Sequence, residues 1–135
     1  MAVIDYEEVQ PPAGFVVPSG TKIFKWPKTG QAFTEDDTGK PLPCGHYADK
    51  VVQVYVAGDG ATFNGATTTI QGALHPDPAA AVYASLHEPG GNALAYTAAG
   101  LNQVLENAES IRPAVTVADP TGLVILVHLY TSARR

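Results

Sequence analysis

Two runs of alternating side chains, joined by a glycine-punctuated loop within residues 50–72, constrain the fold more than any other feature of the sequence. In the first run valine occupies every second position from Val52 to Val56, and in the second the same period of two resumes over residues 66–71. A period of two is typical of β-strands whose two faces have different surroundings. The pattern predicts two strands paired as a hairpin. Because an isolated hairpin is marginally stable in water, one of its faces needs an apolar cover.

The C-terminal part of the chain repeats this alternation. Residues 111–117 alternate, ADPTG follows as a turn signal, and residues 123–130 form a second run. One face of this last run carries Leu123, Ile125, Val127 and Leu129. Val124 and Leu126 make the other face apolar too, so we expect the strand to be covered on both sides, by the N-terminal segment or by a neighbouring subunit. Pro113 lacks an N–H donor and is expected on an edge or bulge.

Residues 81–110 are less regular. Short strands are expected at residues 81–86 and 93–97, separated by the turn sequence HEPGGN. Within residues 98–110 the apolar residues have the spacing i, i+3, i+4, i+7, which would suit one face of a helix; they are Leu101, Val104, Leu105 and Ala108. Gly100 and two asparagines weaken that helix. We favour a turn followed by a short strand over residues 103–106, with the helix as the alternative.

The first 49 residues hold six of the eleven prolines and have weak periodicity, which predicts a proline-rich N-terminal arm with loops. Phe15, Phe24, Trp26 and Phe33 also lie there, so we expect the segment to be ordered, with extended pieces at residues 14–17 and 21–26. Residues 50–135 are expected to form a β-sandwich domain. Seven or eight short strands with frequent turns and little helix predict an all-β fold, an antiparallel β-sandwich with an extended N-terminal arm. Jelly-roll connectivity is one topology that fits.

The charge and the cysteine content limit the classes of partner that we expect for this protein. The net charge is −5, and no Lys or Arg occurs between Val51 and Ile111, so no basic patch for nucleic acid is visible. Cys44 is the only cysteine, which excludes an intramolecular disulfide. The N-terminal residues lack the pattern of a secretory signal, and the longest apolar run, residues 123–127, is only long enough for a strand. We therefore expect neither a nucleic-acid nor a membrane partner.

Candidate metal ligands are few. They are Cys44, His46, His75, His87 and His128. The closest pair, Cys44 and His46, matches no zinc-site spacing, and His128 lies on a predicted strand where a packing role is expected. Asp36, Asp37 and Asp59 stand beside glycines in a pattern that suits calcium but that tight turns also require. No Gly-x-Ser-x-Gly elbow or phosphate-binding loop is present, so we expect no catalytic residue, no metal and no cofactor.

Aromatic residues are the remaining candidates for a binding site. Those that could stack on a sugar are Tyr6, Trp26, Tyr47, Tyr55 and Tyr130. The alternative is that they pack in the core or in an interface between subunits, where aromatic side chains contribute much of the binding energy. Packing is the interpretation that we favour.

Several motifs of the chain are similar to those of a known family. They are YADKVVQV at 47–54, GATTTIQG at 65–72, YTAAG at 96–100, SIRP at 110–113 and the closing LVHLYTSARR. Over residues 47–135 the sequence resembles small head decoration, or cement, proteins of tailed bacteriophages. It departs from them after residue 72, where ALHPDP replaces a short Ser-Asn-Asp-Gly type of turn, and in the first 46 residues, which match no motif of the family.

The resemblance implies a β-sandwich or jelly-roll protein, bound in many copies to the outside of an icosahedral head as a dimer or trimer where capsomers meet. We expect a structural virion protein that is made in the host cytoplasm, is not an enzyme, binds the major capsid protein and stabilises contacts between capsomers. The alternative is a carbohydrate-binding β-sandwich of a phage tail or surface protein. The residues expected in interfaces are Phe15, Phe24, Trp26, Tyr55, Val124 and Leu126.

Overall fold

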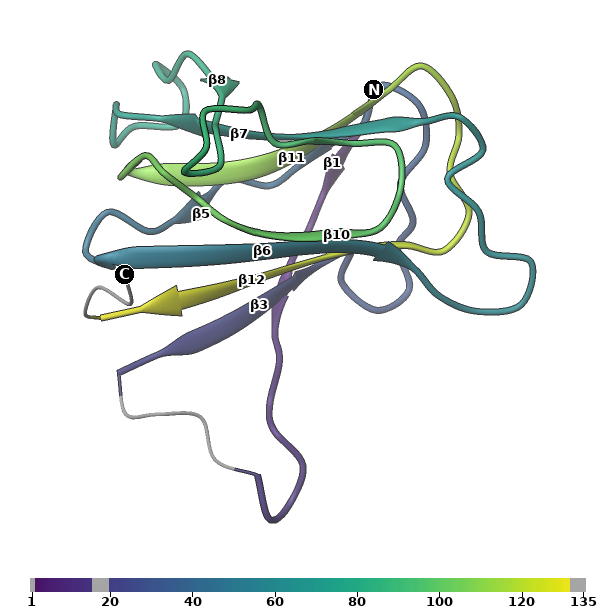
Figure 1. Ribbon diagram of the computed structural model, residues 1–135, viewed down its shortest axis with the longest axis horizontal. Helices are drawn as coiled ribbons and strands as arrows, with labels where there is room; N and C mark the ends of the chain where they lie inside the picture. The colour runs from purple at the N-terminus through teal and green to yellow at the C-terminus, as the bar shows by residue number, and fades with distance from the viewer. Residues whose placement is uncertain (1, 16–19, 132–135) are drawn as a thin grey trace.

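The computed structural model describes residues 2–15 and 20–131, which form two packed β-sheets (Figure 1). Sheet A consists of β1 (Val3–Ile4), β4 (Thr38–Gly39), β5 (Leu42–Pro43), β7 (Thr67–Ala73), β8 (Ala84–Ser85), β9 (Ala95–Tyr96) and β11 (Ser110–Thr116). Sheet B consists of β2 (Glu7–Glu8), β3 (Lys22–Trp26), β6 (Asp49–Val56), β10 (Gly100–Gln103) and β12 (Leu123–Tyr130). The predicted all-β sandwich is confirmed. The described residues contain no helix, and hence none that could cross a membrane.

The strands pair almost entirely antiparallel. Sheet A has the order β1-β4-β11-β7-β8, with β5 added to β11 and β9 added to β7, and sheet B has the order β10-β6-β12-β3-β2. Among the strands of the described residues, only the two-residue contact between β1 and β4 is parallel. These strand orders do not confirm jelly-roll connectivity.

The predicted hairpin of residues 50–72 is wrong in its pairing. Strand β6 lies in sheet B between β10 and β12, whereas β7 lies in sheet A beside β11. Alternation shows only that a strand has one buried face, and two strands on opposite layers satisfy it as well as a hairpin does. The intervening residues 57–66 exceed the usual hairpin loop of about two to five residues. They cross between the layers, where Thr62 bridges to Thr121.

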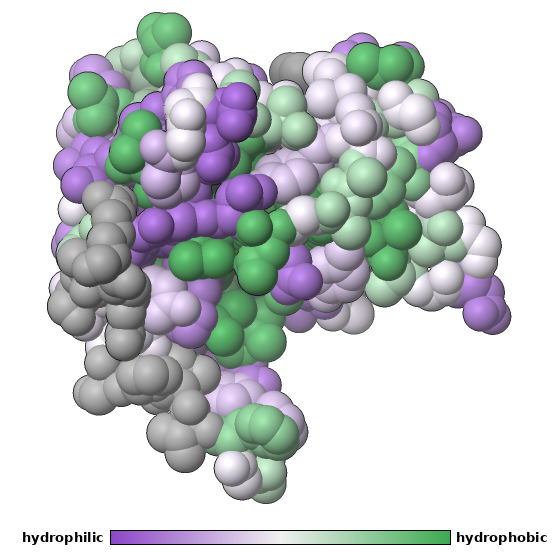
Figure 2. All heavy atoms as spheres, in the orientation of Figure 1, coloured by the Kyte–Doolittle hydropathy of each residue, from purple (hydrophilic) through white to green (hydrophobic). Residues whose placement is uncertain are grey.

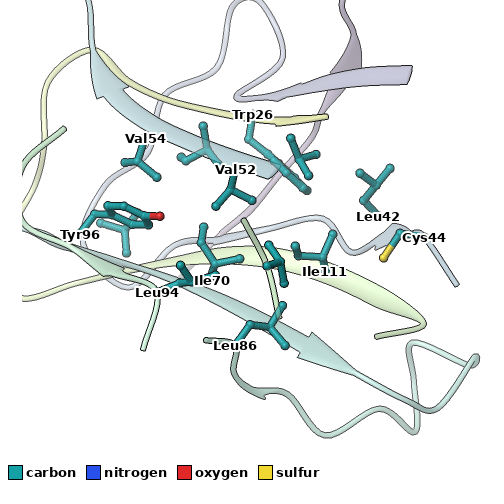
Figure 3. Close-up of a cluster of buried hydrophobic side chains, with 14 of the residues drawn as sticks. Trp26, Leu42, Cys44, Val52, Val54, Ile70, Leu86, Leu94, Tyr96 and Ile111 are labelled. Atoms are coloured by element: carbon teal, nitrogen blue, oxygen red, sulfur yellow. The ribbon is translucent and has the colours of Figure 1, made fainter. Parts of the chain in front are cut away.

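The core lies between the layers and has the predicted faces. Val52 and Val54 of β6 face Ile70 of β7 and Ile111 of β11 across the sandwich (Figure 3). The inward set of β12 is also fully buried, as the alternation predicted: Leu123, Ile125, Val127 and Leu129. Sheet A places Ala66, Thr68 and Ile70 inward in the same way.

The N-terminal segment is part of both sheets. Before residue 49 it supplies five strands, and Trp26, with 1% of its surface exposed, lies in the core together with Phe33 and Leu42. The indole Nε1–H of Trp26 donates to the carbonyl oxygen of Lys40 at 3.1 Å. Both sheets therefore contain strands from either side of the domain boundary that was expected at residue 49. What extends away from them is the connection between β2 and β3 (Figure 1), of which residues 16–19, including part of the expected extended piece at 14–17, lie outside the described residues.

The irregular region forms strands rather than a helix. The strands expected at residues 81–86 and 93–97 are reduced to β8 and β9, each of two residues. The favoured turn and strand in residues 98–110 are present as β10, but the strand begins at Gly100 and ends at Gln103, earlier than predicted. Pro113 lies within β11, between the residues paired with β5 and the one paired with β4, so its missing donor falls in a gap between two short neighbours.

Candidate functional site

The outward-facing side of sheet B forms an apolar surface with a shallow hollow of about 300 Å³. We call this surface the outer B face. The residues lining the hollow come from four strands and are Ile23, Val51, Gln53, Leu101, Leu126, His128 and Tyr130. Hydrophobic side chains gather in the middle of Figure 2, in the region where β6 and β12 are drawn in Figure 1. No Asp, Glu, Lys or Arg lines the hollow.

Strand register explains why these side chains meet. Leu126 lies opposite Gln53 of β6, and His128 lies opposite Val51 of β6 and Ile23 of β3. Residues that face one another across antiparallel strands share a face, so the even-numbered positions of β12 and the odd-numbered positions of β6 collect on the outer side. The His128 ring stacks on Tyr130 with the ring centroids 4.1 Å apart, and His128 Nδ1 and the Tyr130 hydroxyl lie 3.0 Å apart. The polar atoms of this pair therefore partly satisfy each other.

Three of the six predicted interface residues lie on the outer B face. Tyr55 and Val124 are directly paired between β6 and β12, and Leu126 lies next to them on β12. All three are half-buried in the single chain. The apolar second face predicted for the last strand is thus present, and within the described residues no second layer lies over its hollow.

Two of the predicted interface residues point elsewhere. Trp26 is buried in the core, so it cannot contact a partner without unfolding. Phe24 pairs with the inward-facing Val127 and packs edge-on against Tyr6, with the ring centroids 5.5 Å apart. The prediction for Trp26 is wrong, because this residue occupies an inward position of the strand expected at residues 21–26 and its ring is buried. Phe24 is only half-buried at the margin of the core, so its interface role stays a prediction.

The sixth residue, Phe15, lies on the extension between β2 and β3 with 72% of its surface exposed. A second hollow of about 300 Å³ is lined by Phe15, Val9, Pro11 and their neighbours. Ile23 lines both this hollow and the one on the outer B face. The extension and the outer B face therefore form one continuous surface.

The aromatic residues considered for sugar stacking do not form one platform. Trp26 and Tyr47 are buried, and Tyr6 packs between Phe24 and Trp26. Tyr6 is nevertheless half-exposed, as are Tyr55 and Tyr130, and of these three the last two lie on the outer B face. The favoured interpretation, packing, is confirmed for Trp26 and Tyr47.

The candidate metal ligands are dispersed. Cys44 is buried and close enough to the carbonyl oxygen of Ala108 to donate to it, at 3.4 Å, and burial raises the pKa of its thiol to about 11, with Lys50 nearby opposing the shift and Glu109 adding to it. His46 packs on Tyr47. Among the described residues no group of three or more His, Cys, Asp or Glu lies together in a way that could hold a metal ion.

The remaining histidines and aspartates support local structure. His75 Nδ1 accepts a hydrogen bond from the backbone N–H of Asp77, and His87 Nδ1 lies 2.6 Å from a carboxylate oxygen of Glu106. Burial alone would raise the pKa of Glu106, but the hydrogen bonds from His87 outweigh it and lower that pKa.

Asp37, one of the suggested calcium ligands, instead accepts hydrogen bonds from the backbone N–H groups of Ala2 and Thr34, each at 2.8 Å. Its neighbour Asp36 is exposed in a left-handed turn conformation with φ 67°, and Asp59 is exposed in the loop after β6. The turn interpretation of these aspartates therefore fits the structure.

The outer side of sheet A differs from the hollow of the outer B face because it carries a charged side chain, Arg112. The Arg112 guanidinium lies over the Tyr83 ring, 3.9 Å from its centroid, and its Nε donates to Gln71 at 3.0 Å. Nearby, a largely apolar cavity of about 560 Å³ is lined by Leu74, Val82, Leu86 and several small residues, with His75, Glu106 and Asn107 also in its wall. Sequence reasoning missed the Arg112–Tyr83 pair, although Arg112 is the only Lys or Arg between Val51 and residue 131.

Leu101 is the other residue that the sequence reasoning misplaced, since it was assigned to a possible helix face. In the structure it lies on the outer B face with 63% of its surface exposed.

No protein-family model matches the chain, and no curated protein or solved structure matches it either, so the family resemblance drawn from its motifs stays a proposal.

Proposed function

We propose that this protein is a capsid decoration protein that binds the outer surface of a tailed-phage head and stabilises the contacts between capsomers. Its partner is the major capsid protein, and the protein itself is a homo-oligomer on the virion. The observation that carries the proposal is the outer B face, whose hollow is lined by four strands without a charged side chain and which is continuous with the Phe15 extension. Contiguous exposed apolar surface on a water-soluble domain is typical of protein interaction sites.

The rigid sandwich suits a part that is added to an assembled shell. A protein that binds the assembled lattice but not free capsid subunits stabilises the lattice by mass action. A copy that touches two capsomers gains further from effective concentration, because its second contact is intramolecular once the first is made. Small contact energies per copy then add up over the whole shell. The outer B face and the extension, joined at Ile23, provide two adjacent contact regions for such bridging.

The test is the resistance of heads to heat or chelator with and without this protein. Heads that lack it should break open at a lower temperature, and adding the purified protein should restore resistance. Leu126→Asp, which puts a carboxylate on the outer B face, should fail to restore it. Val82→Asp is the matched control, because Val82 is exposed beside the sheet A cavity and far from the proposed contact. Equal resistance with and without the protein would reject the cement role.

A carbohydrate-binding module is the second candidate. Tyr55 and Tyr130 are half-exposed on the outer B face, and Gln53 lies two residues before Tyr55 on β6, so this face offers stacking surface and a hydrogen-bonding amide. Glycan-array binding that is lost in Tyr55→Ala would favour this function over the first. An array without signal, together with head binding, would reject it.

A further inference from the structure

Strand β10 forms one edge of sheet B, and its unpaired side carries free backbone groups. Val104 N–H donates to the Lys50 carbonyl at 2.9 Å, which makes these two residues a hydrogen-bonded antiparallel pair. Hydrogen-bonded and non-hydrogen-bonded pairs alternate along such a ladder. Asn102 and Gly100 therefore also bond to β6, whereas the N–H and C=O groups of Leu101 and Gln103 point away from it.

These four groups have no partner among the described residues. One step further along, the Leu105 N–H is already bonded to the His87 carbonyl at 2.8 Å, so the open edge ends at Gln103. The open edge is thus short and sharply defined: one donor and one acceptor at Leu101, and the same at Gln103.

The edge is short, but it lacks the charged side chains and the proline that keep many sheet edges from pairing. Natural proteins protect edge strands with charged side chains, proline or bulges. The opposite edge of the same sheet, β2, has two glutamates that pair with Lys22 and Lys25. Strand β10 has the sequence GLNQ, with neither charge nor proline, and its Leu101 is 63% exposed. One edge of sheet B is therefore protected and the other is open.

The open groups are self-complementary. If a second β10 lies antiparallel to the first with Asn102 opposite Asn102, then Leu101 lies opposite Gln103 of the other copy and Gln103 lies opposite its Leu101. Both of these are hydrogen-bonded pairs, in which each residue donates one bond and accepts one. All four free groups on each copy are then satisfied in a single register, and a two-fold axis passes between the two asparagines. A contact of this kind is isologous and closes at two copies.

We propose that two copies of this protein pair through β10 and form a dimer in which their B sheets become one continuous sheet. The outer B faces of the two copies then adjoin, and the two Leu101 side chains become diagonal neighbours within reach of each other. The low charge of the edge matters here, because each chain carries a net charge of −5 and a charged edge would repel its own copy.

This inference deepens the self-association included in the proposed function and selects a dimer over a trimer. It does not need a head for its test, so its failure is distinguishable from failure of the cement role. If the protein forms the β10 dimer but does not bind heads, the dimer proposal stands and the cement role is rejected. If a monomer binds heads, the cement role stands and the dimer proposal is rejected.

The first experiment measures mass by sedimentation equilibrium from about 1 µM to 1 mM, the range in which weak protein pairs associate. The wild type should shift from 14.1 kDa toward twice that mass. Leu101→Lys places a cation on the edge of each copy and should stay monomeric throughout. Leu74→Lys is the matched control, since Leu74 is 75% exposed, makes the same change of charge, and lies outside sheet B. It should dimerise like the wild type.

The second experiment follows amide hydrogen exchange by nuclear magnetic resonance. The amides of Leu101 and Gln103 should exchange slowly at high concentration and become fast on dilution, while Asn102 and Val104 stay slow throughout because they bond to β6. In Leu101→Lys the amides at 101 and 103 should be fast at every concentration, and slow exchange at Asn102 would show that the variant is folded. A wild type that stays monomeric to about 1 mM overturns the proposal, as does a dimer whose Leu101 and Gln103 amides exchange fast.

Discussion

Two neighbouring residues of β12 should respond very differently to the same truncation. Ile125 has none of its surface exposed, and its strand lies between β6 and β3 at the centre of sheet B. Leu126 points to the outer B face and is half-buried. Removing the side chain to Cβ at Ile125 leaves a cavity in a close-packed core, whereas at Leu126 water replaces the lost atoms.

The magnitudes follow from burial. Truncating a fully buried isoleucine to alanine costs about 2–5 kcal/mol of the free energy of unfolding. Unfolding entropy is roughly 2.1 cal/mol/K per residue, so a chain of 135 residues has about 0.28 kcal/mol/K. Ile125→Ala should therefore lower Tm by about 7–18 °C. Leu126→Ala loses about 1 kcal/mol of partial burial, which corresponds to roughly 4 °C.

The assay is thermal unfolding followed by circular dichroism at a protein concentration low enough to keep the chain monomeric. A loss at Ile125 at least twice the loss at Leu126 is the expected result. Equal losses at the two positions, or a larger loss at Leu126, would refute the assignment of the two faces of β12.

Three further predictions concern single side chains. Asp37→Ala removes the acceptor of the Ala2 and Thr34 hydrogen bonds and should cost about 1–3 kcal/mol by urea unfolding. Burial alone would raise the pKa of Asp37, but these hydrogen bonds outweigh burial and lower the pKa. The wild type should therefore keep this stabilisation until the pH falls below about 4 and Asp37 becomes protonated. In Asp37→Ala the free energy of unfolding should depend less on pH in this acidic range. In Gly39→Ala the new Cβ would stand only 2.4 Å from Cδ of Pro113, so we expect a loss of about 1–3 kcal/mol, and unchanged stability would contradict the packing there. Native Cys44, buried and with its pKa raised to about 11, should react with a thiol reagent at pH 8 only as fast as the chain unfolds; rapid reaction of the folded protein would contradict its burial.

The fold class was predictable because alternation identifies buried faces. The inward sets of β6, β7 and β12 were assigned correctly, since each strand has a consistent apolar side. Alternation does not say which strand lies beside which, and for that reason β6 and β7 were paired wrongly. Pairing depends on long-range contacts between layers, which leave no local pattern in the sequence.

The N-terminal segment and β10 were misplaced for a different reason. Strand β3 is only five residues long and ends at the residue before Pro27, so its period was too short to separate the inward Trp26 from an exposed aromatic. In β10 the leucine of the edge also fitted a helical spacing, and the competing helix concealed an outward-facing position. Short elements carry too few residues for period alone to decide their type or their faces.

The outer B face was only partly predictable. The apolar second face of β12 was visible in Val124 and Leu126, and Tyr55 was expected in an interface. Ile23 and Leu101 join that face only because β3 and β10 pair within sheet B, which is a property of the topology. The surface therefore combines a local pattern with neighbours that only the folded structure brings together.

The most direct test of the proposed function is the number of copies of this protein in intact, purified virions relative to the major capsid protein. Quantitative mass spectrometry of particles that are purified through a density gradient provides this ratio. A decoration protein should be present at a constant number of copies per capsomer, and washing with buffer should not remove it. Its absence from intact particles, or a small and variable amount, would contradict the proposal that the outer B face binds the capsid.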